Sequence, residues 1–143
     1  MESIQIKDHM NHRPVYFSGK ETVVEAVEKL LQSRSSGGPV INEQREVIGF
    51  VSEQDCLKAM ISSSYHSGES SKSVADVMKV DVLTKKPYDS VLQLAEEMVS
   101  IKPRVYPVVD DDGILLGCVN RSEVLRALDM HLHSLYQAGH RYV

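Results

Sequence analysis

The sequence predicts an α+β fold in which two β-α-β-β-α repeats pack through their sheets with pseudo-two-fold symmetry. A shift of 68 residues aligns positions 6–60 with positions 74–128 without a gap, and ten of the 55 aligned residues are identical. Each copy carries one apolar stripe at helical spacing, followed by two short apolar runs. The length of 143 residues indicates one domain, whereas a single unit of about 55 residues buries too little surface to stand alone.

The first half of each repeat predicts a short extended stretch and a helix. An amphipathic segment ends at Met10 or Met78, and the extended stretches are expected at residues 15–17 and 82–84. Thr22 and Ser90 then predict helix N-caps, because their hydroxyls can accept an unpaired backbone N–H. Apolar residues at helical spacing predict one buried face on each helix: Val23, Ala26, Val27, Leu30 and Leu31 in the first, and Val91, Leu94, Ala95, Met98 and Val99 in the second.

The second half of each repeat predicts a hairpin and a final helix. Short apolar runs with proline at the strand start cover 38–41 and 106–109. Polar turns at 42–46 and 110–113 lead to strands at 47–51 and 114–119, and helices follow over 52–62 and 121–136. We therefore predict a first repeat at 1–62, a Ser-rich linker at 63–73, and a second repeat at 74–143 with an extended C-terminal helix.

Composition excludes several classes of protein. Sixteen basic and 20 acidic residues give a net charge of −4, which argues against a nucleic-acid-binding surface. The charged N-terminus lacks a signal sequence, and the apolar runs are too short for membrane insertion, so we expect a cytoplasmic protein. Two cysteines are too few for a disulfide framework. No metal site is expected, because His131 and His133 would point to opposite sides of a helix.

A motif recurs at the junction of each second hairpin strand with its final helix. The first copy reads Gly49-Phe50-Val51-Ser52-Glu53-Gln54-Asp55-Cys56, and the second runs from Gly117 to Val124 with asparagine and glutamate in place of the serine and aspartate. With the 68-residue repeat, this motif makes the chain resemble a tandem pair of cystathionine β-synthase (CBS) domains, an arrangement called a Bateman module. The resemblance covers residues 6–60 and 74–128.

The resemblance implies a regulatory module rather than an enzyme. Such pairs sense adenosine-containing ligands (AMP, ADP, ATP, S-adenosylmethionine or NAD-like molecules) in the cleft between repeats, often as energy sensors, without a catalytic cofactor. The implied partners are a second copy in a homodimer and an unknown effector protein. One alternative is a ligand-free dimerisation or interaction scaffold. Another is a nucleotide hydrolase, although the sequence contains no phosphate-cradling loop or evident nucleophile–base arrangement.

The first motif predicts one ligand site. Ser52 begins a helix, where backbone N–H groups favour a phosphate, and Asp55 can accept bonds from both ribose hydroxyls. The alternative for both residues is a helix capping box. The resemblance adds Leu83 beside the adenine, with plain core as its alternative. It also places Arg104 and Arg121 near the phosphates, and the alternative for Arg104 is a solvated loop cation. The predicted first site comprises Ser52, Gln54, Asp55, Leu83, Arg104 and Arg121.

The mirror-related site is expected to be weaker, empty, or adapted to another ligand. Its side chain at 120 lacks a hydroxyl, its acid at 123 is one methylene longer, and the serine at 36 replaces the arginine of the other repeat, so a cation is missing. The glycines at 37 and 38 either admit a base closely or form a flexible turn. This second site comprises Val15, Ser36, Gly37, Gly38, Asn120 and Glu123.

The last helix carries an apolar stripe that extends beyond the repeat. Such a stripe predicts either packing against a partner, which the implied two-fold dimer would supply, or folding back of the helix onto its own module. The stripe consists of Val124, Leu125, Leu128, Leu132, Leu135 and Tyr136.

Overall fold

The computed structural model describes residues 4–62, 72–100 and 103–140. A three-stranded sheet has the order β1-β2-β3, with β1 parallel and β3 antiparallel to β2, and a second sheet is the antiparallel pair β4-β5. Most of the predicted linker, residues 63–71, lies outside the described residues. In chain order the elements are η1 (Ile6–Asp8), β1 (Phe17–Ser18), α1 (Val23–Ser33), β2 (Gly37–Ile41), β3 (Val47–Ser52), α2 (Glu53–Met60), α4 (Val74–Val77), α5 (Val91–Ser100), β4 (Val105–Val109), β5 (Leu115–Asn120) and α6 (Arg121–His140).

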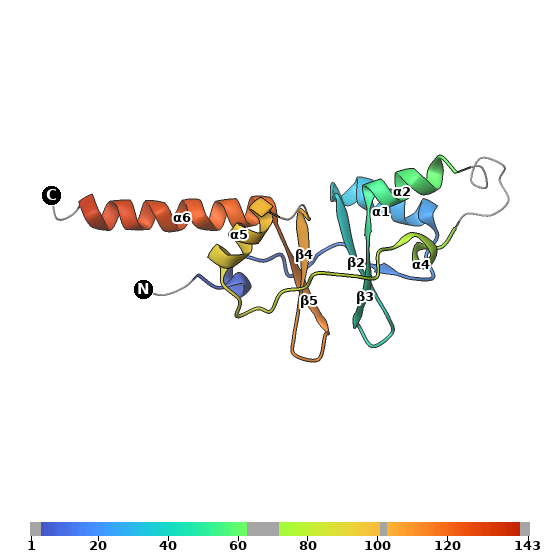
Figure 1. Ribbon diagram of the computed structural model, residues 1–143, viewed down its shortest axis with the longest axis horizontal. Coiled ribbons are helices and arrows are strands. Elements are labelled where there is room, and N and C mark those ends of the chain that lie inside the picture. Colours follow the sequence, from blue (N-terminus) through green and yellow to red (C-terminus); the bar gives the residue numbers. More distant parts are fainter. Residues whose placement is uncertain (1–3, 63–71, 101–102, 141–143) are drawn as a thin grey trace.

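The hairpins β2-β3 and β4-β5 lie side by side at the centre of the molecule, with the helices on its outer sides (Figure 1). Their turns bond reciprocally: the Val47 amide donates to the Gly113 carbonyl at 3.2 Å, and the Leu115 amide donates to the Arg45 carbonyl at 2.9 Å. The two bonds are equivalent, because Val47 and Arg45 correspond to Leu115 and Gly113 under the 68-residue shift. The predicted α+β fold with pseudo-two-fold symmetry is therefore confirmed.

The two repeats exchange their N-terminal segments. The Ile6 amide donates to the Asp89 carbonyl at 3.0 Å, which places η1 against the second repeat. The Val74 amide donates to the Glu21 carbonyl at 2.7 Å, which places α4 against the first repeat. Val74 is accordingly part of the first hydrophobic core and Ile6 part of the second. Neither core is complete without a segment of the other sequence repeat, so the two halves are interlocked.

Close passage of these exchanged segments explains why Gly49 and Gly117 are identical in the repeat. The extended chain after η1 pairs with β5, where the Asn11 amide donates to the Cys118 carbonyl at 2.8 Å. A Cβ at Gly117 would collide with the Asn11 carbonyl oxygen, and one at Gly49 would lie 3.0 Å from the Lys79 carbonyl oxygen and would displace the Met78 side chain. Only glycine allows the backbone to approach so closely.

The predicted helix starts are confirmed. The Thr22 hydroxyl accepts the Glu25 amide at 3.1 Å, and the Ser90 hydroxyl accepts the Gln93 amide at 3.3 Å. The buried faces of these two helices are narrower than predicted. Leu31 and Val99 were expected to be buried, but they are 68% and 90% exposed.

Two local predictions about the strands are wrong. No strand forms at 82–84; instead Lys85 makes an isolated parallel bridge to Val108, the counterpart of the Phe17–Val40 pairing in β1 and β2. The bridge lies one residue beyond the predicted stretch because the repeat displacement carries Phe17 onto Lys85. Residues 37 and 38 are not a flexible turn, since both are buried in β2, opposite the end of β3.

The final helix is longer than predicted and runs outward from the body of the molecule (Figure 1). Val124 is buried against the second core and Leu128 packs on it, but Leu132 and Leu135 are exposed. None of the helices in the described ranges is both long enough and apolar enough to span a membrane.

Candidate functional site

Two clefts lie where the repeats meet, and they are related by the pseudo-two-fold axis. Cleft A, whose lining includes Val15, Asn120 and Glu123, has a volume of about 380 Å³. Cleft B, whose lining includes Ser52 and Leu83, has a volume of about 580 Å³. Both volumes are within the usual range for small-molecule sites. Many of their lining residues correspond by the 68-residue shift, such as Val15 in cleft A and Leu83 in cleft B. Ser36 and Arg104, themselves an equivalent pair, line both clefts. The clefts are therefore neighbours that share a wall.

Cleft B begins at the junction of β3 with α2. The Asp55 carboxylate accepts the Ser52 amide at 3.0 Å and the Ser52 hydroxyl at 2.8 Å, and the Asp55 amide donates to that hydroxyl at 3.1 Å. These bonds form the capping box that the sequence offered as the alternative reading. Ser52 lines the cleft, whereas Asp55 is 7% exposed and lies behind it.

Four of the six residues predicted for the first site line cleft B together: Ser52, Gln54, Leu83 and Arg104. Leu83 is half exposed, so it is not core and presents an apolar surface to the cleft. The charged residues of the lining balance, because Lys79 and Arg104 accompany Glu53 and Asp81. Arg121 does not line this cleft.

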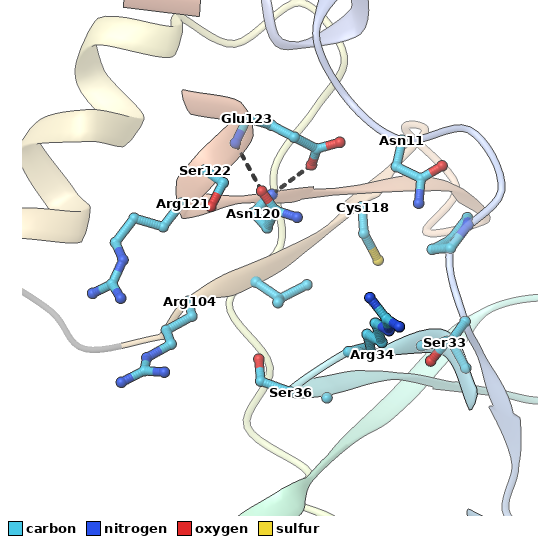
Figure 2. Close-up of a pocket in the computed structure, with 15 residues that line it drawn as sticks. Asn11, Ser33, Arg34, Ser36, Arg104, Cys118, Asn120, Arg121, Ser122 and Glu123 are labelled. Carbon is cyan, nitrogen blue, oxygen red and sulfur yellow. Dashed lines mark hydrogen bonds between the residues drawn. The ribbon is translucent and has the colours of Figure 1, made fainter. Parts of the chain in front are cut away.

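Cleft A collects most of the predicted second site. Val15, Ser36, Gly37, Asn120 and Glu123 line it together, whereas Gly38 does not, because it is buried in β2 against the Val15 carbonyl. At the start of α6 the Asn120 amide donates to Glu123 and the Glu123 amide donates to Asn120, both at 2.8 Å (Figure 2). Asparagine and glutamate thus rebuild the capping box of Ser52 and Asp55.

The environment of Glu123 opposes its charge. Burial raises the pKa of the carboxyl, while the backbone bond from Asn120 and the nearby charge of Arg126 lower it by less. Burial also raises the pKa of the Cys118 thiol, on the wall of the same cleft, to about 12. Cys118 is therefore a protonated, weakly nucleophilic group at neutral pH.

The expectation that cleft A lacks a cation is wrong. Arg34, Arg104 and Arg121 all line it. Arg34 caps the end of α1 with a left-handed backbone, and its counterpart in the second repeat, residue 102, lies outside the described residues. The sequence prediction missed Arg34 because it looked for a cation only at position 36, the repeat equivalent of Arg104. Arg34 lies two residues before that position, at the C-terminal end of α1, and lines the same cleft.

Metal binding has no support in the described ranges. Within residues 4–62, 72–100 and 103–140, no three His, Cys, Asp or Glu residues gather closely enough to hold an ion. The two clefts combine polar side chains, arginines and apolar side chains such as Val15 and Leu83. Such a lining suits an organic anion.

Comparison with known proteins gives one family and several relatives. The family model described as CBS domain matches residues 6–62 and 74–130. The chloroplastic CBS domain-containing protein CBSX1 of Arabidopsis thaliana is 31% identical over 130 residues, which cover 74% of this chain and 55% of that protein. Homoserine O-acetyltransferase of Methanosphaera stadtmanae is 22% identical over 96% of this chain, but the chain spans only 25% of that enzyme.

Among solved structures, the CBS-pair protein CBSX2 of Arabidopsis thaliana superposes with a TM-score of 0.81 at 27% identity, over 92% of this chain and 99% of that one. A second structure of CBSX2 is a complex with AMP; it has a TM-score of 0.78 and 28% identity, over 88% of this chain and 96% of that one. The similarity therefore extends over nearly the whole length of both chains.

Proposed function

The chain belongs to the CBS domain family, as a tandem pair, and from this premise we propose that it is a regulatory module that binds an adenosine-containing ligand between its repeats. The observation that carries the proposal is the pair of equivalent clefts, each lined by both repeats and large enough for a nucleoside. The AMP complex of CBSX2 supports it from a related pair.

In cleft B the base lies against Leu83, and the polar groups of Ser52 and Gln54 hold the sugar side of the ligand. Arg104 binds the phosphate, because its planar guanidinium can bond two oxygens at once. Asp55 receives the ribose hydroxyls through the carboxylate oxygen that Ser52 leaves free, or by turning away from Ser52. The ligand class is AMP, ADP, ATP, S-adenosylmethionine or NAD.

In cleft A the base lies against Val15 and Gly37, and Asn120 and Ser36 supply hydrogen bonds. Glu123 stands where Asp55 stands in the other repeat and takes the ribose. Arg121 belongs to this ligand rather than to the ligand of cleft B.

Regulation follows if the ligand favours one arrangement of the interlocked repeats over another, because a ligand shifts only an equilibrium whose states it binds unequally. The changed surface is read by an effector protein. We infer that the module turns over no nucleotide: burial raises the pKa of the Cys118 thiol in cleft A, and the Ser52 hydroxyl in cleft B is engaged in the capping box of α2.

A homodimer is part of the proposal. Leu31 and Val99 are exposed at equivalent positions of the two repeats, and so are Leu57 and Leu125, at 59% and 69%. Matching apolar groups on the helices of both repeats suit a two-fold interface that uses each repeat in turn. The same surface favours the alternative function, a scaffold that dimerises without any ligand.

Native mass spectrometry of the purified protein, followed by titration calorimetry with AMP, ADP, ATP, S-adenosylmethionine and NAD, tests the proposal. We expect one of these ligands to bind at micromolar concentration and to raise the melting temperature by mass action. Dimers that bind none of the five at millimolar concentration would establish the scaffold instead. Chromatography of the recovered nucleotide should show it unchanged, and its hydrolysis would overturn the regulatory assignment.

A further inference from the structure

Three arginines from three separate segments line cleft A. Arg34 ends α1, Arg104 precedes β4, and Arg121 begins α6. In the described part of the chain, none of the three has a carboxylate within ion-pair distance. The whole chain is acidic, with a net charge of −4, so this cluster does not belong to a generally basic surface. Unpaired like charges in one cleft predict an anionic ligand.

The backbone of Arg34 gives a second reason to look at this residue. Its φ is 54°, in the left-handed region where glycine is the usual residue at a helix C-cap. Arginine is therefore a costly choice for the backbone at this position. In the described ranges one other residue besides glycine has a positive φ: Arg45, at 64°, whose repeat counterpart is Gly113. At Arg34 the side chain lines cleft A, whereas Arg45 lines none of the clefts described here.

The charged residues that line cleft A favour an anion with several negative charges. In Figure 2 the Arg104 and Arg121 side chains extend in the same direction, away from Arg34, which lies beneath Cys118. Cleft A also sets three arginines against Glu123 alone, whereas the charges lining cleft B balance.

We propose that cleft A is a polyphosphate site, selective for ligands with two or more linked phosphate groups, and that Arg34 is its specificity-determining residue. The nucleoside part of such a ligand, a nucleoside di- or triphosphate, rests on the proposed function; the phosphate part rests on the arginines alone. Arg34, Arg104 and Arg121, which all line the cleft, supply the positive charges that bind the phosphate groups. Cleft B takes the ligands of lower charge.

The chain supplies a matched pair of variants. Arg34→Gly and Arg45→Gly remove the same charge and relieve the same left-handed backbone, so both should fold. Arg45→Gly also removes the contact of its guanidinium with the Tyr16 ring, 5.5 Å from the ring centroid, so the melting temperatures of both variants are measured alongside binding. Titration calorimetry at an ionic strength of about 0.15 M then compares tripolyphosphate, orthophosphate, ATP and AMP. Wild type and Arg45→Gly should bind tripolyphosphate at least about tenfold more tightly than orthophosphate, and Arg34→Gly should lose about tenfold for tripolyphosphate and ATP but not for AMP.

The outcomes separate this inference from the proposed function. Tripolyphosphate binding that depends on Arg34, with no binding of ATP or AMP, would support the polyphosphate site and overturn the nucleotide proposal. AMP binding with no gain for ATP, and no Arg34-dependent binding of tripolyphosphate, would overturn the polyphosphate site and leave the nucleotide proposal standing. An equal loss in Arg34→Gly and Arg45→Gly would show a general charge effect and would also overturn it.

Discussion

The carboxylate of Asp55 accepts both the amide and the hydroxyl of Ser52, at 3.0 and 2.8 Å, at the edge of cleft B. The same serine hydroxyl accepts the Asp55 amide at 3.1 Å. Ser52 thus caps the N-terminus of α2 and also lines cleft B. Its structural role and its proposed role in ligand binding need separate measurements.

Thr22 provides the control for Ser52, because it forms the same box with Glu25 at the start of α1 and lines none of the clefts described here. We expect Ser52→Ala and Thr22→Ala each to lower the free energy of unfolding by about 1 kcal/mol, since each removes one capping hydroxyl. Only Ser52→Ala should weaken adenosyl-ligand binding. Urea denaturation and calorimetry on both variants check this, and unchanged affinity in Ser52→Ala would remove Ser52 from the site.

Arg104 is expected to affect both clefts, because it lines both. Arg104→Ala should weaken AMP and ATP together, by about tenfold each if one charge-assisted contact is lost. Arg121 lines cleft A alone, so Arg121→Ala should weaken ATP and tripolyphosphate while AMP binding in cleft B persists. Competition titrations of AMP against tripolyphosphate distinguish these patterns. A selective loss of one ligand in Arg104→Ala would show that its guanidinium serves one cleft.

Glu123 should make cleft A sensitive to pH. Burial raises the pKa of this carboxyl above its ordinary 4.5, so the folded state holds the proton more tightly than the unfolded chain does. Glu123 therefore contributes stability that is present below pH 4.5 and lost as the pH rises through the raised folded pKa. A lower pH also removes a negative charge from the lining of cleft A, which should strengthen anion binding.

Glu123→Gln isolates this effect, because the amide oxygen can still accept the Asn120 amide. We expect the variant to bind tripolyphosphate severalfold more tightly than wild type at pH 7, and the difference to shrink toward pH 4.5. Comparing the two proteins at each pH cancels the titration of the ligand itself. A wild-type profile parallel to that of the variant would mean that Glu123 stays in one protonation state across the range.

The periodic features of the fold were predictable from the sequence, since helix caps and apolar spacing act locally. Thr22 and Ser90 cap the helices as predicted. The exchange of η1 and α4 between the cores was not predictable, because the repeat is equally consistent with each segment packing in its own half. Leu31 and Val99 show a second limit of the sequence prediction. Apolar periodicity identifies an apolar helix face, but it does not show whether that face packs within the same chain or stays exposed.

The candidate site was predictable in its parts but not in its assembly. The repeat alignment found the equivalent residues, and four of the six predicted for the first site do line one cleft. The sequence assigned Arg121 to the first site, whereas in the structure it lines cleft A and not cleft B. The order of residues in the chain does not show which of two adjacent clefts the start of a helix faces. Arg34 was missed because the backbone at a helix end, and not a motif, directs it.

The proposed homodimer predicts an effect of Leu57, which is exposed beside a small apolar cavity between α1 and α2. Leu57→Asp should shift the sedimentation coefficient toward the monomer by placing a charge in the interface. Val80→Asp serves as the control, because Val80 is 69% exposed outside the helices. Equal sedimentation of wild type and Leu57→Asp as dimers would exclude this face from the interface.

Tyr106 in β4 offers the clearest test of packing. Its side chain is fully buried in the second core, and its hydroxyl finds no hydrogen-bond partner in the part of the chain that the structure describes. An unmade bond at a buried polar group costs free energy, so Tyr106→Phe should leave the free energy of unfolding unchanged or raise it by about 1 kcal/mol. Tyr106→Ala should instead lower it by about 3–5 kcal/mol through the cavity it leaves.

Tyr88→Phe is the control for the hydroxyl, because the Tyr88 hydroxyl donates to Asp111 at 2.8 Å on the surface. The free energy of unfolding of this variant should fall only slightly, because the exposed hydroxyl exchanges its bond to Asp111 for bonds to water. Chemical denaturation of the three variants at pH 7 measures the differences directly. A loss in Tyr106→Phe larger than that in Tyr88→Phe would mean that the buried hydroxyl is bonded in solution, and it would place an ordered polar group inside the second core.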